Sequence, residues 1–167
     1  MYDKLTQVDI DKMQEELDYR IGTLRPQILE EVKFARSHGD LSENAEYHAA
    51  KQRKGKNESR IRFLKNMIKT AQIVSADSAP DCVGLFDTVT YWIEEDEEEE
   101  TVRIATTMRQ DALCNIVSDE SPIGKAILGC KVGERAVVKV DEEYSYTVVI
   151  RTIQKGEDDA SLEIRGY

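Results

Sequence analysis

The sequence has few cysteines, and their spacing is wrong for a stabilising framework. The 167 residues include only Cys82, Cys114 and Cys130, which are far apart and form no C-x-x-C pair. An odd number of separated cysteines argues against a disulfide network or a zinc site. We expect three free thiols that pack as small apolar side chains.

Long apolar runs are also missing. No segment approaches the ~18 consecutive apolar residues that span a membrane, and the first residues lack the basic and then apolar pattern of a signal peptide. We therefore expect a soluble, cytoplasmic protein that does not contact a membrane. The length suits one large or two small domains, so each half can bury only a narrow seam or a small sheet.

The charge is strongly acidic overall but unevenly distributed. The net charge is −10; residues 1–76 carry 14 Lys and Arg against 12 Asp and Glu, and residues 77–167 carry 9 against 21. This asymmetry predicts two domains, 1–76 and 77–167, joined by a polar linker at 75–81. Because nucleic-acid binding requires phosphate neutralisation, the overall acidity argues against binding RNA or DNA without a partner.

The first domain has the pattern of two helices. Apolar residues recur every three or four positions and are separated by charged ones, which predicts a narrow coiled-coil seam. A proline, Pro26, should kink the first helix without shifting the phase of its stripe. Because only residues 38–42 separate the two stripes, we expect a long antiparallel helical hairpin with its tip near residues 38–44. The stripes are Ile10, Met13, Leu17, Ile21, Leu24, Ile28, Val32 and Ala35, then Tyr47, Ala50, Ile61, Leu64, Ile68 and Ala71.

The tip carries two acids three residues apart. Gly39 can end the first helix in a left-handed conformation, which would put Asp40 at the N-cap of the second helix and Glu43 at its third position. This spacing allows a purely structural capping box. It also allows two exposed carboxylates that bind Mg²⁺ weakly until another molecule supplies further ligands.

The second helix is basic. Between residues 44 and 74 it carries eight Lys and Arg against two Glu. The strip is either a solvated face partly neutralised by the first helix or a guide for an RNA or DNA backbone. The residues predicted to contact RNA, at the tip end of the strip, are Lys51, Arg53 and Lys54. His38 and His48 flank the tip and are assigned no role.

The second domain has the pattern of a small sheet. Runs rich in β-branched and aromatic residues at 86–93, 101–105, 135–140 and 144–153 predict a mostly antiparallel sheet, and residues 122–128 predict one short helix. Seven adjacent acids at 94–100 predict a solvated hairpin loop. No catalytic triad, phosphate loop or metal cluster is evident, so we expect a docking module and an α+β protein.

Two motifs resemble those of the bacterial Gre transcript cleavage factors, the GreA type most closely. The segment R-S-H-G-D-L-S-E-N-A-E-Y-H-A-A, residues 36–50, resembles the tip motif of the family. The segment S-D-E-S-P-I-G-K-A-I-L-G, residues 118–129, resembles its C-terminal motif. The two motifs occur in the expected order and structural context, and the resemblance covers nearly the whole chain.

The resemblance implies a monomeric RNA polymerase regulator that is not itself an enzyme. Its hairpin would enter the secondary channel, and its FKBP-like domain would dock at the channel rim. Asp40 and Glu43 match the acids that share a Mg²⁺ ion with the polymerase site and so promote cleavage of backtracked nascent RNA. The remaining matches are Lys51, which would face the RNA, Tyr47 and Asn44, which would support the tip, and Ser121, Pro122 and Ile123, which would lie near the polymerase.

Two alternatives remain open at this point. A Gre-like paralogue could occupy the channel and inhibit the polymerase without promoting cleavage. An FKBP-like sheet also occurs in prolyl isomerases, which need an apolar aromatic pocket. The acidic loop at 94–100 and the tail at 156–167 depart from the common pattern of the family, and no role is predicted for either.

Overall fold

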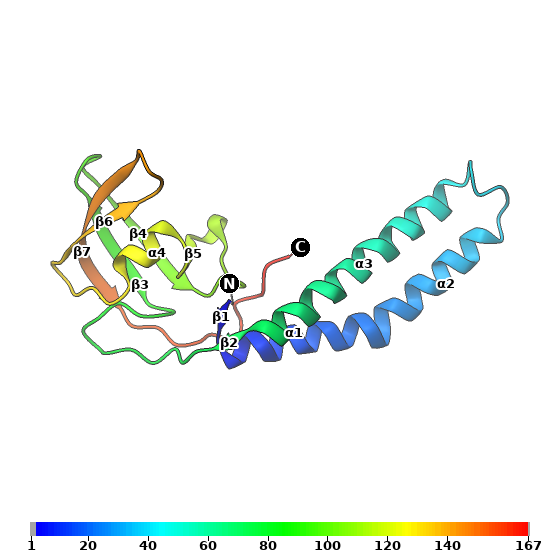
Figure 1. The fold of residues 1–167 in the computed structure, drawn as a ribbon, viewed down its shortest axis with the longest axis horizontal. Coiled ribbons are helices and arrows are strands. Elements are labelled where there is room, and N and C mark those ends of the chain that lie inside the picture. The colour runs from blue at the N-terminus through cyan, green and yellow to red at the C-terminus, as the bar shows by residue number, and fades with distance from the viewer. Residues whose placement is uncertain (1–2, 167) are drawn as a thin grey trace. The chain divides into compact units, whose positions relative to one another are not determined.

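The computed structural model describes residues 3–166 and divides them into two compact units (Figure 1). One unit comprises Ile10–Ala71, and the other combines the described residues up to Asp9 with Gln72–Gly166. The predicted boundaries, 1–76 and 77–167, therefore differ from the observed ones. Strand β1 (Lys4–Leu5) pairs in parallel with β2 (Gln72–Ile73), which joins the start of the chain to the C-terminal unit. Two-residue strands have too few positions to show a sequence pattern.

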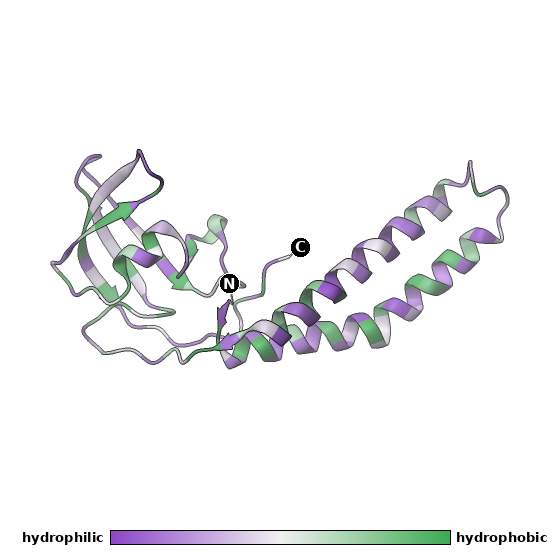
Figure 2. Ribbon diagram, viewed as in Figure 1, coloured by the Kyte–Doolittle hydropathy of each residue, from purple (hydrophilic) through white to green (hydrophobic). Residues whose placement is uncertain are grey.

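The helical unit confirms the predicted hairpin. Its first arm runs through α1 (Gln7–Tyr19), a π-helical turn (Arg20–Leu24) and α2 (Arg25–Arg36), and its second arm is α3 (Ala45–Thr70). The 26 residues of α3 span about 39 Å, and Figure 2 shows this helix largely in the hydrophilic colours. The seam buries one narrow stripe from each arm. The buried apolar residues are Met13, Leu17, Ile28, Ala35, Ala50, Ile61, Leu64 and Met67.

The predicted kink takes the form of the π-helical turn. Pro26 lies in the first turn of α2, directly after the turn, whose wider hydrogen bond runs from the Arg25 N–H to the Arg20 carbonyl. Proline has no N–H to donate, and its ring crowds the carbonyl four residues earlier. A π turn relieves this conflict without ending the helix, so the apolar stripe continues into α2.

Ion pairs across the seam complement the narrow apolar stripe. Arg60 is 4% exposed and binds both carboxylate oxygens of Glu16 at 2.8 and 2.9 Å, and Arg20 binds the same carboxylate at 2.7 Å. Burial alone would raise the pKa of Glu16, but the hydrogen bonds from Arg60 and Arg20 outweigh it and hold that pKa below its ordinary value. Glu16 therefore stays ionised at neutral pH and links the arms in one register.

The C-terminal unit contains a five-stranded sheet in the order β5-β4-β3-β7-β6. The prediction of a mostly antiparallel sheet is confirmed, and its one parallel pair is at the edge, where β5 runs beside β4. Residues 106–115 bring the chain back beside the last three residues of β4, where Ile116 pairs with Arg103 and Ser118 with Ala105. Strand β5 is too short to show alternation. The strands are β3 (Thr88–Ile93), β4 (Glu98–Ala105), β5 (Ile116–Ser118), β6 (Arg135–Lys139) and β7 (Ser145–Gln154).

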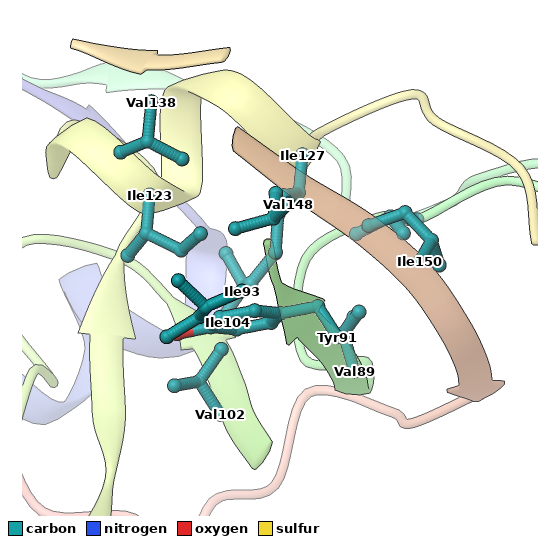
Figure 3. Packing of buried hydrophobic residues seen from close by; sticks show 11 residues of the cluster. Val89, Tyr91, Ile93, Val102, Ile104, Ile123, Ile127, Val138, Val148 and Ile150 are labelled. Atoms are coloured by element: carbon teal, nitrogen blue, oxygen red, sulfur yellow. The ribbon is translucent and has the colours of Figure 1, made fainter. Parts of the chain in front are cut away.

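One short helix covers this sheet, as predicted. Helix α4 (Pro122–Ile127) turns Ile123 and Ile127 toward the apolar side chains of the strands (Figure 3). Val89, Tyr91 and Ile93 alternate along β3 with more exposed residues, so one face of the strand is buried. The α+β class is confirmed. Within residues 3–166, no helix is both long and apolar enough to cross a membrane.

The acidic run is only partly a loop, which corrects the prediction for residues 94–100. Residues 94–97 form the turn, and the next three glutamates begin strand β4. The sheet provides partners: Glu94 binds Arg135 at 2.6 and 2.7 Å, Glu95 accepts from the Thr147 N–H, and Glu100 accepts from the Tyr91 hydroxyl. The partners of Glu94 and Glu95 lie 41 and 52 residues away in β6 and β7, so a run of like charges does not reveal them.

A buried arginine joins both ends of the chain within this unit. The side chain of Arg109 is fully buried, and it pairs with Asp9 at 2.6 Å and with Asp158 at 2.5 Å. Its guanidinium also lies 4.6 Å from the centre of the Phe86 ring. Thr6 and Asp9 exchange hydrogen bonds in the manner of a capping box at the start of α1. The tail, for which no role was predicted, thus helps to neutralise a buried cation.

We predict that Arg109→Met destabilises the C-terminal unit by about 3–5 kcal/mol, because it leaves two carboxylates without their buried cation. Urea denaturation followed by the fluorescence of Trp92, the only tryptophan, measures the change. Lys131→Met is the control, since Lys131 pairs with Asp81 and both side chains are more than half exposed. It should leave the denaturation midpoint nearly unchanged. Equal effects of the two substitutions would contradict the assignment of Arg109 as a structural centre.

Candidate functional site

The tip of the hairpin is a loop of eight residues between α2 and α3. Helix α2 ends at Arg36, and Gly39 adopts a φ of +126°, a region that favours glycine. The prediction that Asp40 is the N-cap of the second helix is wrong, because Asn44 occupies that position. Asn44 directly precedes the first helical residue. Asp40 lies four positions earlier and accepts hydrogen bonds from Ser42 within the loop.

Asn44 connects both helix ends through one side chain. Its Oδ1 accepts a hydrogen bond from the Tyr47 N–H at 3.0 Å, and its Nδ2 donates to the Ala35 carbonyl at 2.7 Å. The first bond satisfies a free donor at the start of α3, and the second adds to the bond that the Ala35 carbonyl already accepts from the His38 N–H at the end of α2. Asn44 therefore connects the ends of the two helices, and its role in supporting a functional tip stays a prediction.

Asp40 is exposed, and its carboxylate is held by the loop. The backbone N–H and the hydroxyl of Ser42 both donate to Oδ1 of Asp40 at 3.0 Å. These two bonds hold the pKa of Asp40 below its ordinary value, because they stabilise the ionised form. Oδ2 makes no hydrogen bond within the described residues, so a charged oxygen is available to another molecule.

Both predicted acids line one surface hollow. This tip hollow is formed by His38, Asp40, Glu43, Asn44, Ala45 and Glu46. The carboxylates of Asp40 and Glu43 are oxygen donors of the kind that Mg²⁺ prefers. In the part of the chain that the structure describes, no three His, Cys, Asp or Glu side chains are grouped so that they could hold a metal ion. The two acids fit Mg²⁺ as part of a ligand set.

The three residues predicted to contact RNA differ in their surroundings. Arg53 pairs with Glu31 of α2, so the first helix already neutralises it. Lys51 and Lys54 are exposed and have no ion pair within residues 3–166. The remainder of the basic strip divides in the same way: Arg60 is committed to Glu16, whereas Lys56 is exposed. The first helix thus neutralises the arginines Arg53 and Arg60 of this strip, whereas its exposed lysines are available to bind an anionic partner.

Comparison with known proteins covers nearly the whole chain. Residues 4–73 match the family model for the N-terminal domain of transcription elongation factors, and residues 69–155 match the GreA/GreB C-terminal model. Transcription elongation factor GreA of Leuconostoc mesenteroides is 42% identical over 87% of this chain and 91% of its own length. GreA of Geobacillus kaustophilus is 40% identical over 81% of this chain and 86% of its own.

The chain belongs to the GreA/GreB family of transcription elongation factors. The names of these relatives confirm the resemblance to the GreA type. Among solved structures, GreA factor homolog 1 (Gfh1) of Thermus thermophilus is 22% identical, with a TM-score of 0.44 over 93% of this chain and 100% of that one.

The second motif of this Gre factor has a clear structural role. Ser121 caps α4 by accepting from the Gly124 N–H, and it donates to the Ser118 carbonyl. A Cβ at Gly124 would lie 2.2 Å from that carbonyl oxygen, so the turn requires glycine. Ile123 is 8% exposed and packs in the core. Of the three predicted docking residues, only Ser121 and Pro122 therefore offer surface to a partner, and their contact with RNA polymerase stays a prediction.

Tyr47, the other predicted supporting residue, is half-buried at the start of α3. The guanidinium of Arg36 lies 5.6 Å from the centre of its ring, and the His48 ring lies 5.6 Å away on the neighbouring residue. The contact with Arg36 reaches the last turn of α2. The Asn44 side chain links backbone groups of the two helices, and Tyr47 adds a contact between side chains of the same two helices.

We predict that Asn44→Ala accelerates hydrogen exchange of the Tyr47 amide by about 5-fold, because the loss of an N-cap costs about 1 kcal/mol. Asn44→Asp keeps the acceptor but loses the donor to Ala35, so it should leave the Tyr47 amide protected. Exchange measured by NMR tests both variants, with the Leu64 amide in the middle of α3 as the internal reference. Unchanged exchange at Tyr47 in the alanine variant would show that Asn44 does not cap the helix.

Proposed function

We propose that this protein stimulates the cleavage of backtracked nascent RNA by RNA polymerase. The hairpin enters the secondary channel, and the tip brings Asp40 and Glu43 to the catalytic centre of the polymerase. The protein is not a nuclease itself; it supplies ligands in trans. The observation that carries the proposal is the tip hollow, where an exposed, ionised Asp40 and an exposed Glu43 lie together at the end of a helical arm.

The loop geometry suits this role. The hydrogen bonds from Ser42 hold Oδ1 of Asp40 and so orient the carboxylate. The other oxygen, Oδ2, is then available to a ligand. When bound, Mg²⁺ supplies a positive charge that activates water and stabilises the transferred phosphate. Asp40 and Glu43 would hold the ion from one side, and the remaining ligands would come from the polymerase and the RNA. A partial ligand set makes binding weak in the free protein and confines the activity to the complex.

The exposed lysines of α3 extend the proposal toward the RNA. Lys51 and Lys54 lie in the second and third turns of α3, and both are exposed. Each ammonium group can neutralise one phosphate and release its counterion. The relatives are transcription elongation factors by name, which agrees with RNA polymerase as the partner. The C-terminal unit would dock outside the channel, with Ser121 and Pro122 at the contact.

We expect Asp40→Asn and Glu43→Gln each to lower stimulated RNA cleavage about 100-fold or more, because each removes a charged metal ligand. Binding to the polymerase and folding should be unaffected, since both side chains are exposed. The measurement is transcript cleavage in stalled elongation complexes over a range of Mg²⁺ concentrations. Glu46→Gln is the matched control, because Glu46 lines the same hollow without being a predicted ligand. A similar loss in all three variants would refute the assignment to the pair.

Replacing Lys51 and Lys54 by alanine should weaken the effect of salt on binding to backtracked complexes. Each phosphate contact that is lost lowers the slope of log affinity against log salt concentration by about 0.7. Arg53→Ala should change the slope less, because Glu31 already neutralises Arg53. Binding titrations at several KCl concentrations measure the slopes. A larger change for Arg53 than for the lysines would reverse the assignment.

A further inference from the structure

An exposed aromatic pair lies beside the tip hollow. Phe34, in the last turn of α2, is 65% exposed and lies outside the buried seam. Its ring contacts the ring of His38, with centroids 4.4 Å apart and planes tilted by 54°. Nδ1 of His38 also lies 3.2 Å from the Phe34 carbonyl oxygen. The two contacts hold His38 against Phe34, so the rings present one joined aromatic surface.

This surface adjoins the predicted catalytic acids. His38 lines the tip hollow together with Asp40 and Glu43. A ligand in the hollow therefore meets the carboxylates and the His38 ring of the same loop, and Phe34 contacts that ring from the last turn of α2. This arrangement was not predicted, because a single histidine on a polar helix is usually just solvated and Phe34 lies off the apolar stripe.

The surroundings of Phe34 indicate the chemistry of its partner. Lys33 precedes it and Ser37 follows it by three positions, and both are exposed, whereas the guanidinium of Arg36 lies over the Tyr47 ring. An apolar groove on a protein partner would require several apolar neighbours, which this turn lacks. Two adjoining exposed rings suit a flat, unpaired nucleobase, since every base can stack on an aromatic face.

We propose that Phe34 and His38 form a stacking surface for an unpaired nucleobase of the extruded RNA. This inference rests on the proposed function, which brings RNA to the tip, and it adds a specificity determinant to that function. The rings contact the base, whereas the acids of the loop act at the phosphate. Stacking tolerates any base, but purines should bind more tightly than pyrimidines because their ring area is larger.

The test compares backtracked complexes whose extruded RNA carries either normal nucleotides or abasic ribose. The affinity of the protein for each complex is measured by fluorescence titration, independently of cleavage, and the cleavage rate is measured in parallel. Phe34→Ala should lower the affinity for normal RNA about 5- to 100-fold, and Phe34→Trp should retain it. On abasic RNA, wild type should bind as weakly as Phe34→Ala. Leu29→Ala is the control, because Leu29 is an exposed apolar residue of the same helix, 43% exposed.

Each other outcome overturns the inference in an identifiable way. An equal loss for Phe34→Ala on normal and abasic RNA would show that the ring contacts the polymerase protein. No loss on either complex would show that the ring makes no contact. If wild type fails to stimulate cleavage, the proposed function fails, and the affinities for normal and abasic RNA still decide whether a base stacks at Phe34.

Discussion

The narrow apolar seam between the two arms of the hairpin is the constraint on which the tip depends. Each arm buries a single stripe, so most of its surface stays polar and most of its charges stay hydrated. Such a seam specifies that the helices pack side by side but defines their register weakly. The partly buried pair of Glu16 and Arg60 adds this information, because a shift of one turn would separate the two charges.

The loop at the end of the seam divides structural and chemical roles between neighbouring residues. Asn44 satisfies a backbone group at each helix end, so neither acid is needed to cap α3. Asp40 is instead oriented by Ser42 and remains hydrated and charged. Because both acids are exposed, their charge carries little desolvation cost in the free protein. This separation explains how a small loop can present two carboxylates without destabilising the hairpin.

The C-terminal unit is held by a different kind of interaction. Its sheet and α4 form an ordinary apolar core, but its chain ends meet at the buried Arg109, which is neutralised by Asp9 and Asp158. Asp9 and Asp158, which lie near opposite ends of the chain, must therefore come together to neutralise Arg109. The same unit shows why part of the second motif is structural: Ile123 fills the core, and Gly124 permits the close turn at Ser118.

The sequence alone determined the hairpin, the position of its tip and the presence of two acids there, because three- and four-residue spacing and a short connection are local properties. It also indicated most strands and α4. Tertiary structure decided the rest: Asn44 rather than Asp40 caps α3, Glu31 neutralises Arg53, β5 runs parallel to β4, and His38 faces the acids beside Phe34. These features require side chains or strands from separate segments to meet, and neither residue type nor spacing records which partners the folded chain brings together.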